Sequence, residues 1–197
     1  MMSRYFWTFG TRLIILFLLL AALLMNANCT PGFQASNPPW NSCYTATGEH
    51  PCDFKLINQD GKEVRLYDYY GKVIILDFST MWCGPCQMAA RSVDSTIEKF
   101  GAENIEYVTI LIENTSGQPP TVHDLEVWAA YNNIEIGPVL AADRDFLFEN
   151  EWQVEGWPTF YFIDKNMILR DSMRGYSSPR VDAIISTLVA EPIQPLN

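Results

Sequence analysis

The pattern of apolar and polar positions changes its period in the middle of the chain, where residues 72–100 read KVIILDFSTMWCGPCQMAARSVDSTIEKF. Residues 73–78 are a short apolar run rich in β-branched residues, with one acid, Asp77, inside it. Such a run predicts a strand buried on both faces, as in a parallel sheet. After it, apolar residues recur at alternating steps of four and three, at Cys86, Ala90, Val93, Ile97 and Phe100. This spacing predicts one helix whose buried face includes Cys86.

The same criteria divide the rest of the chain into short elements. Alternation around turn residues predicts two hairpins, and continuous apolar runs predict further buried strands. The expected strands, besides residues 73–78, are residues 54–57, 63–66, 105–112, 139–142, 159–163 and 167–174.

Three more helices are expected downstream. Thr121 followed by Asp124 is a capping box, which predicts a helix start. The apolar stripe expected for this helix is Val127, Ala130 and Tyr131. Residues 144–152 are expected to form a second helix with Trp152 facing inward, and Ser178 is expected to cap the last helix, with Pro179 at its first position. The order of elements predicts an α/β fold, with a helical segment inserted between a βαβ half and a ββα half.

Two cysteines lie where the buried strand meets its helix, in Trp82-Cys83-Gly84-Pro85-Cys86. The unpaired N–H groups and the positive dipole end of a first helical turn favour an anion, so we expect the pKa of the Cys83 thiol to be lowered. Cys86, one turn further on, should be less exposed and less acidic. This asymmetry suits disulfide exchange, in which Cys83 attacks a partner disulfide and Cys86 releases the reduced partner. Pro85 has no N–H to lose at a helix start, and Gly84 permits close approach to the backbone.

This motif after an apolar strand resembles the thioredoxin superfamily, in which WCGPC is the active-site sequence. The resemblance implies a thioredoxin-like fold, a role for Asp77 in deprotonating Cys86, and a cis-proline at Pro158 that faces the cysteines. The residues expected to bind substrate are Trp82, Gly84, Pro85, Trp157 and Pro158. Two positions depart from thioredoxin: Ser79 replaces a tryptophan, and Trp157 is bulkier than the usual residue before the cis-proline.

Other interpretations of the two cysteines stay open. A single C-x-x-C is half of a zinc site, but no second pair follows, and only His50 and His123 could complete it. A thiol peroxidase would need a threonine and an arginine beside its cysteine, and the nearest, Thr80 and Arg91, have the wrong spacing. A copper-delivery protein of this fold has more widely spaced cysteines and a distal histidine. We expect neither a bound metal nor a cofactor.

The start of the chain resembles a secretory signal over residues 1–28, with basic residues before an apolar stretch. The stretch at residues 13–25 is short for a membrane span, which needs about 20 residues. The following Cys29 resembles the lipid acceptor of bacterial lipoproteins. Lipidation at Cys29, cleavage after Ala27 and an uncleaved anchor all remain open. Residues 30–40 are rich in Pro, Asn and Ser, which predicts a tether.

Cys43 and Cys52 follow the tether. If Cys29 carries lipid, the four remaining cysteines pair as Cys83–Cys86 and Cys43–Cys52, and an exported protein permits such a second bridge. A structural disulfide is favoured over a second redox pair, because no helix start lies near Cys43 or Cys52. The expected domains are residues 1–28 as signal peptide, 29–52 as tether, 53–191 as thioredoxin-like domain and 192–197 as tail.

Composition and charge limit the possible partners. The chain has 197 residues, of which 48% are hydrophobic and 13% aromatic, which indicates a packed globule rather than disorder. Its formal net charge of −10 argues against a nucleic-acid partner, because phosphates would be repelled.

Taken as a whole, the sequence resembles the envelope-anchored, TlpA-like thiol-disulfide oxidoreductases. The resemblance implies a protein-disulfide reductase, facing the periplasm, that acts on disulfide-containing exported proteins such as apocytochrome c. It also implies a membrane thiol-electron donor as a partner. We expect a monomer attached to the membrane through lipid or an N-terminal anchor. A thiol peroxidase, a copper-site assembly protein, a disulfide oxidase or isomerase and a non-catalytic binding module remain as alternatives.

Overall fold

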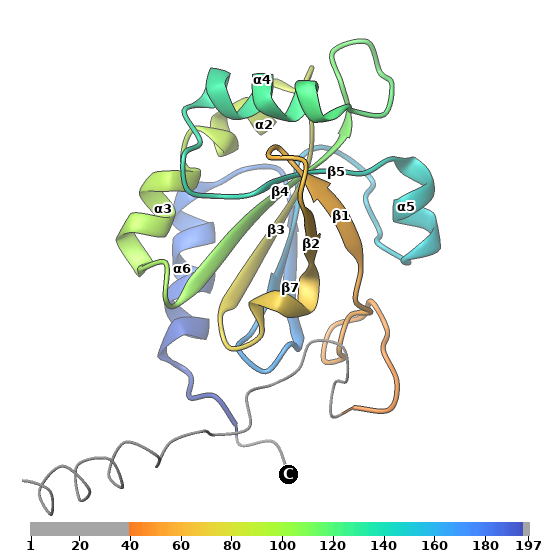
Figure 1. Ribbon diagram of the computed structural model, residues 1–197. Coiled ribbons are helices and arrows are strands. Elements are labelled where there is room, and N and C mark those ends of the chain that lie inside the picture. The colour runs from red at the N-terminus through yellow and green to blue at the C-terminus, as the bar shows by residue number, and fades with distance from the viewer. Residues whose placement is uncertain (1–39, 195–197) are drawn as a thin grey trace, which may run out of the picture. The chain divides into compact units, whose positions relative to one another are not determined.

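Strand β3 (Val73–Thr80) lies at the centre of the structure, a computed structural model that describes residues 40–194. All 8 of its residues are buried, as its apolar run predicts. It pairs in parallel with β4 (Ile105–Glu113) and antiparallel with β6 (Thr159–Ile163). The remaining strands are β1 (Lys55–Asn58), β2 (Glu63–Arg65), β5 (Val139–Ala141) and β7 (Leu169–Arg174). Among the described residues they form one 7-stranded mixed sheet in the order β2-β1-β5-β4-β3-β6-β7 (Figure 1).

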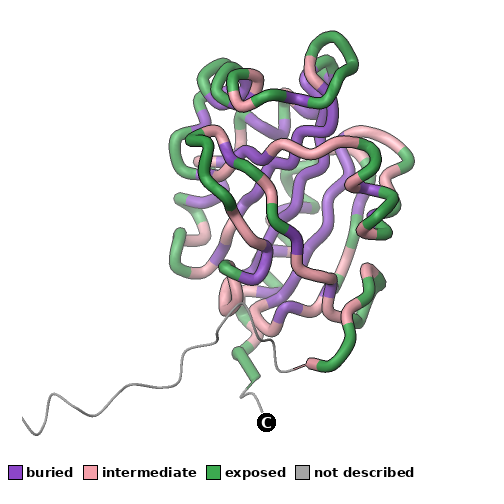
Figure 2. Tube along the Cα trace, turned by 45° about the vertical axis from the view of Figure 1, so that its right-hand side comes forward, coloured by how far each residue is buried: buried purple, intermediate pink, exposed green. Residues whose placement is uncertain are grey.

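Helices cover this sheet and complete the core. They are α2 (Gly84–Ala90), α3 (Val93–Phe100), α4 (Val122–Asn132), α5 (Arg144–Glu149) and α6 (Ser178–Ala190), with a 3₁₀ turn, η1 (Leu66–Tyr69). One large buried cluster joins apolar side chains of β3, β4 and β6 to those of α2, α3, α4 and α6. Figure 2 shows the buried strands inside and the exposed residues on the outer turns of helices and loops. The predicted α/β fold and both predicted hairpins are confirmed.

The helix expected after the cysteines is split into two. Helix α2 ends at Ala90 and α3 begins at Val93. At the break, the backbone N–H and the hydroxyl of Ser92 both donate to the carbonyl of Ala89, at 2.9 and 2.7 Å. This local bonding by serine competes with the regular helical pattern. The predicted apolar stripe is nevertheless buried at Cys86, Ala90, Val93 and Ile97.

The capping box that begins α4 is confirmed, but the predicted apolar stripe of this helix is wrong. Thr121 and Asp124 bond to each other's backbone N–H groups. Val127 and Tyr131 are 44% and 62% exposed. The buried residues are Leu125, Trp128, Ala129 and Asn132. Apolar residues occur on nearly every side of this helix, so spacing alone could not select the face that carries the large Trp128 indole.

Two other helix boundaries differ from expectation. Helix α5 ends at Glu149, earlier than predicted, although Trp152 still packs inward, with its ring centroid 5.3 Å from that of Phe78. The residue at the cap of α6 is Ser177 rather than Ser178, and its side chain makes no capping bond. Among residues 40–194, no helix combines the length and apolar character that crossing a bilayer requires.

The described part of the expected tether packs onto the domain. A disulfide joins Cys43 to Cys52. The His50 ring stacks on Trp40 with centroids 4.0 Å apart, and its Nδ1 lies 2.8 Å from the carbonyl oxygen of Met167. The expected signal peptide, Cys29 and the tether up to residue 39 lie outside the described residues, as do residues 195–197.

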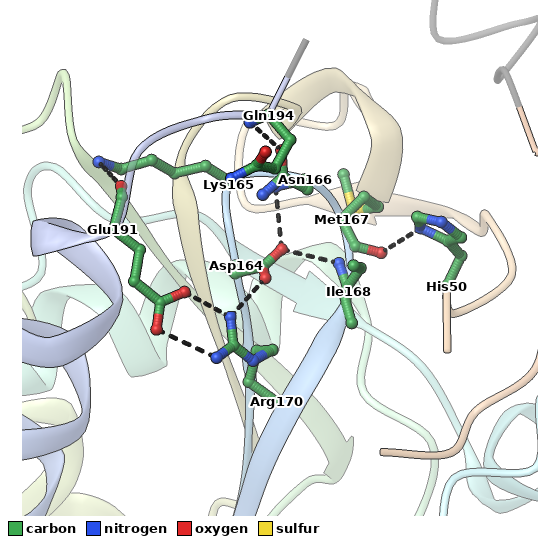
Figure 3. Close-up of polar contacts among 9 residues, drawn as sticks. All are labelled: His50, Asp164, Lys165, Asn166, Met167, Ile168, Arg170, Glu191 and Gln194. Carbon is green, nitrogen blue, oxygen red and sulfur yellow. Dashed lines mark hydrogen bonds and ion pairs between the residues drawn. The ribbon is translucent and has the colours of Figure 1, made fainter. Parts of the chain in front are cut away.

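A polar network fixes the end of α6 to the β6–β7 turn (Figure 3). The carboxylate of buried Asp164 accepts a hydrogen bond of 2.8 Å from Arg170, which also pairs with both oxygens of Glu191. Lys165 donates to the last carbonyls of α6. Because Ile163 pairs with Ile74, this network lies where β3 begins, at the opposite end of the strand from the cysteines.

We predict that loss of the Cys43–Cys52 disulfide lowers stability without loss of fold. Closing so short a loop, with a sequence separation of 9, removes chain entropy from the unfolded state. Replacing both cysteines by serine should lower the free energy of unfolding by about 2–3 kcal/mol. Urea unfolding of the oxidised protein measures this, and an unchanged unfolding midpoint would contradict it.

Arg170→Met should lower the free energy of unfolding by about 1–3 kcal/mol, because Asp164 loses its cation while buried. The pKa of Glu191 is lowered mainly by its hydrogen bond from Arg170. The stabilisation from the Arg170–Glu191 pair is fully present above the unfolded-state pKa of Glu191. It is lost as the pH falls through the lower pKa that Glu191 has in the folded state. The difference between wild type and variant should therefore shrink below pH 4.5, the ordinary glutamate value. A difference that grows in acid would exclude this origin.

Candidate active site

Cys83 lies at the junction that the sequence predicts, as the N-cap residue of α2. Only Met81 and Trp82 separate it from the end of β3, and the N–H of Met81 fixes the junction by donating to the carbonyl of Glu113 at 3.0 Å. The Sγ of Cys83 accepts a hydrogen bond from the backbone N–H of Cys86 at 3.2 Å. The two cysteines are joined by a disulfide, so this is the oxidised form. A thiolate at Cys83 would receive the same N–H group, which stabilises the charged form.

Both cysteines are buried, and the small difference in their exposure has the expected direction. Cys86 is fully buried, whereas Cys83 is 6% exposed. Around Cys83, Gly84 and Pro85 are exposed and the Trp82 side chain is 50% exposed. A partner that reaches Cys83 therefore contacts this motif surface first, while Cys86 stays beneath it.

Asp77 is a fully buried carboxyl in the middle of β3. Residues of a strand point alternately to its two faces, so Asp77 shares a face with Val73 and Ile75, which belong to the same buried cluster as Cys86. Burial raises the pKa of Asp77 to about 7, against opposing hydrogen bonds from Ser79 at 2.7 Å and Tyr107 at 3.5 Å. A carboxyl with such a pKa both accepts and releases a proton near neutral pH.

Ser79 has a clear place in this arrangement. It stands where thioredoxin has a tryptophan, and its hydroxyl donates to Oδ1 of Asp77. The buried carboxyl thus has a polar neighbour on the same strand face, two residues further on. Tyr107 approaches the other oxygen from β4, and burial raises the pKa of its phenol well above the ordinary value.

The peptide bond between Trp157 and Pro158 is cis. Pro158 is buried, and its carbonyl accepts a hydrogen bond of 2.7 Å from Gly175 N–H. The next residue, Thr159, pairs with Phe78 near the end of β3. Sheet register therefore brings the Trp157–Pro158 segment to the same end of β3 as the redox motif, although the two are distant in sequence.

Two residues of this region were missed by the sequence analysis, Glu113 and Arg144. Trp82 Nε1 donates to one carboxylate oxygen of Glu113 at 2.9 Å, and Arg144 Nε donates to the other at 2.6 Å. The guanidinium carbon of Arg144 lies 5.8 Å from the ring centroid of Trp157. Glu113 could have been found, because the carboxyl ends of parallel neighbours meet at one edge of a sheet. Arg144 carries no such signal.

Within residues 40–194, no group of three or more His, Cys, Asp or Glu side chains is placed to hold a metal ion. His50 contacts the N-terminal segment and Met167, as described above. His123 is solvent-facing on α4 and lies 3.3 Å from Glu126.

The guanidinium of Arg91 lies 5.7 Å from the ring centroid of Tyr131.

Comparison with known proteins identifies the family. The model of the AhpC/TSA family matches residues 47–172, which is more than half of the chain. The chain belongs to the AhpC/TSA family. The thiol-disulfide oxidoreductase ResA of Geobacillus thermodenitrificans (strain NG80-2) is 30% identical over 156 residues, which cover 79% of this chain and 80% of the relative.

Solved structures that resemble this AhpC/TSA family member belong to thioredoxin-type proteins as well. The pneumococcal exposed lipoprotein thioredoxin Etrx1 from Streptococcus pneumoniae strain TIGR4 is 30% identical, with a TM-score of 0.56, covering 70% of this chain and 98% of that one. A candidate thiol:disulfide interchange protein DsbE from Chlorobium tepidum is 25% identical, with a TM-score of 0.60, covering 76% and 98%. The chain has the thioredoxin fold and is an enzyme, a thiol-disulfide oxidoreductase of the thioredoxin type.

Asp77→Asn should change how stability depends on pH. The folded-state pKa of about 7 lies above the ordinary 3.8, so the carboxyl favours the folded state in acid. This contribution is fully present below the unfolded-state pKa and is lost as the pH rises through the folded-state value. The shift corresponds to about 4 kcal/mol at most. The asparagine variant should gain stability relative to wild type between pH 4 and pH 8, as measured by urea unfolding of both oxidised proteins. A difference independent of pH would contradict the raised pKa.

Proposed function

We propose that this protein reduces disulfides of exported proteins in the cell envelope. The supporting observation is the placement of Cys83 at the N-cap of α2, between the exposed Trp82 and Gly84 and just after the strand that carries the buried Asp77. The resolving cysteine, Cys86, is fully buried one helical turn after Cys83. The names of the relatives describe the same class of reaction.

The reaction proceeds in two exchanges. The thiolate of Cys83 attacks one sulfur of the client disulfide, which forms a mixed disulfide and releases the other client sulfur as a thiolate. Cys86 loses its proton, with Asp77 as the acceptor, and attacks the Sγ of Cys83. The mixed disulfide breaks, the second client thiolate leaves, and the Cys83–Cys86 disulfide forms. The client gains two electrons and two protons, and the protein loses as many.

Reduction is favoured over oxidation because of the motif. Gly84, Pro85 and the buried Asp77 match thioredoxin, whose potential is about −270 mV, compared with about −120 mV for a strong oxidant. The pair must then be reduced again, and a membrane thiol-electron donor is proposed to do this. Exported proteins with accessible disulfides, apocytochrome c among them, are the proposed clients.

The envelope location rests on the N-terminal sequence. Residues 1–28 have the pattern of a signal peptide, and Cys29 follows it as a lipid acceptor. The description of one relative as an exposed lipoprotein thioredoxin supports a lipid anchor here. A monomer held at the membrane surface through Cys29 fits a client-reducing role.

Peroxidase activity is the alternative that the family name raises. In sequence, Thr80 and Arg91 are the threonine and arginine nearest to the cysteines, and a peroxidase would need such residues to stabilise its bound peroxide. Thr80 is fully buried, and its hydroxyl has no hydrogen-bond partner in the described structure. Arg91 lies over the Tyr131 ring instead. Steady-state peroxide turnover by the reduced protein tests this alternative directly.

We expect the full chain, supplied with dithiothreitol, to reduce insulin disulfides. Cys83→Ser should abolish the reaction, because no attacking thiolate remains. Cys86→Ala should instead accumulate a mixed disulfide between Cys83 and the client, because resolution is blocked. Non-reducing electrophoresis and mass spectrometry detect this adduct.

A redox titration of the Cys83–Cys86 pair tests the direction. A potential near that of thioredoxin is expected, and one above about −180 mV would move the assignment to an oxidase or isomerase. Insulin reduction that survives Cys83→Ser would remove the mechanism.

A further inference from the structure

Two tryptophans flank the redox centre, and the same carboxylate connects them. Trp82 immediately precedes Cys83, and Trp157 immediately precedes the cis-proline. Glu113 accepts a hydrogen bond from the Trp82 indole and another from Arg144, whose guanidinium lies over the Trp157 ring. The contacts thus run from one tryptophan to the other through an ion pair.

Glu113 is held firmly enough to serve as the fixed part of this chain of contacts. Its side chain is only 12% exposed, both of its oxygens are used, and its backbone carbonyl accepts the N–H of Met81. The register between β3 and β4 shifts just before it: Ser79 pairs with Leu111, but Thr80 pairs with Glu113. One extra residue in β4 therefore brings Glu113, rather than Ile112, opposite the end of β3. Bulges of this kind redirect side chains near active sites.

Arg144 does not stabilise its own helix by these contacts. It is the first residue of α5, and Asp143 provides the cap of that helix by accepting from the N–H of Phe146. The Arg144 side chain is 66% exposed and extends from the inserted helical segment to Glu113 and Trp157. An exposed arginine side chain without contacts would sample many rotamers. The contacts of Arg144 with Glu113 and Trp157 hold it in one position, beside the redox motif.

We propose that Arg144 is a positioning residue that, together with Glu113, holds Trp82 and Trp157 as two fixed indole walls for the client segment around the disulfide. This inference rests on the proposed function. Fixed aromatic surfaces bind with less loss of side-chain entropy than mobile ones. The client it favours is an extended segment with an apolar or aromatic residue beside its cysteine, because such a residue packs against indole rings.

The test uses pre-reduced full-length protein in single-turnover reactions with two synthetic disulfide peptides. One peptide has phenylalanine beside its cysteine and the other has serine. Reaction rates at increasing peptide concentration separate apparent binding from the limiting rate. For wild type, we expect the phenylalanine peptide to bind about tenfold more tightly than the serine peptide.

Arg144→Met keeps the length of the side chain but removes its charge and its hydrogen bond. It should weaken binding of the phenylalanine peptide about tenfold and change the limiting rate by less than about twofold. Arg144→Lys, which keeps the charge, should restore part of the binding. The matched control is Arg170→Met, which breaks an ion pair at the other end of β3. It should leave the preference between the two peptides unchanged.

A second measurement follows the indoles without any client. The Trp82 and Trp157 Nε1–H signals, assigned in nitrogen–proton correlation spectra through Trp82→Phe and Trp157→Phe, should both shift in Arg144→Met. They should remain in place in Arg170→Met. A wild-type protein that reduces neither peptide would overturn the proposed function, and the indole signals would still test the positioning role.

Two outcomes would overturn the inference while leaving the function intact. One is a reductase whose peptide preference is the same in Arg144→Met as in wild type. The other is an unchanged pair of indole signals in that variant. A double-mutant cycle with Trp157→Ala adds a further condition: the binding effect of Arg144→Met should largely disappear when the Trp157 ring is absent.

Discussion

The arrangement of this molecule depends on a carboxyl group placed where water cannot reach it. Asp77 lies in β3, which is buried along its whole length. A charge at such a place is costly, so burial makes Asp77 hold its proton more tightly and raises its pKa. The hydrogen bonds that Ser79 and Tyr107 donate to the carboxyl stabilise the charged form and partly oppose this rise. A group that exchanges a proton near neutral pH thus lies on the sheet face that also packs against α2. The other parts of the site are arranged around the end of the same strand.

Sheet topology gathers these parts. Strand β4 runs parallel to β3, so Glu113 finishes beside the redox motif. Strand β6 runs antiparallel to β3, so its first residues and the preceding cis-proline come to the same end. Figure 1 shows α2 and α4 at that end of the sheet, whereas the Arg170 network lies where β3 begins. The stabilising network and the reactive centre are therefore separated by the length of β3, which makes their contributions separable by mutation.

Local patterns were enough to predict β3, the position of Cys83 at a helix start and the burial of Cys86. Those features follow from residues close together in the sequence. The resemblance to thioredoxin added the cis peptide bond at Pro158. The break between α2 and α3 and the buried face of α4 were not predicted, because a serine side chain and a large indole decided them. The contact from Trp82 to Glu113 joins residues 31 apart, and only the register between strands brings them together. Sequence periodicity carries no information about such pairs.

The most direct test of this account is the ionisation of the Asp77 carboxyl itself. Carbon-13 NMR of the oxidised protein, with the signal assigned by its loss in Asp77→Asn, follows that carboxyl through a pH titration. We expect a midpoint at about pH 7. A midpoint near 3.8, the ordinary value, would show that Asp77 is hydrated and would contradict its proposed role as the proton acceptor for Cys86.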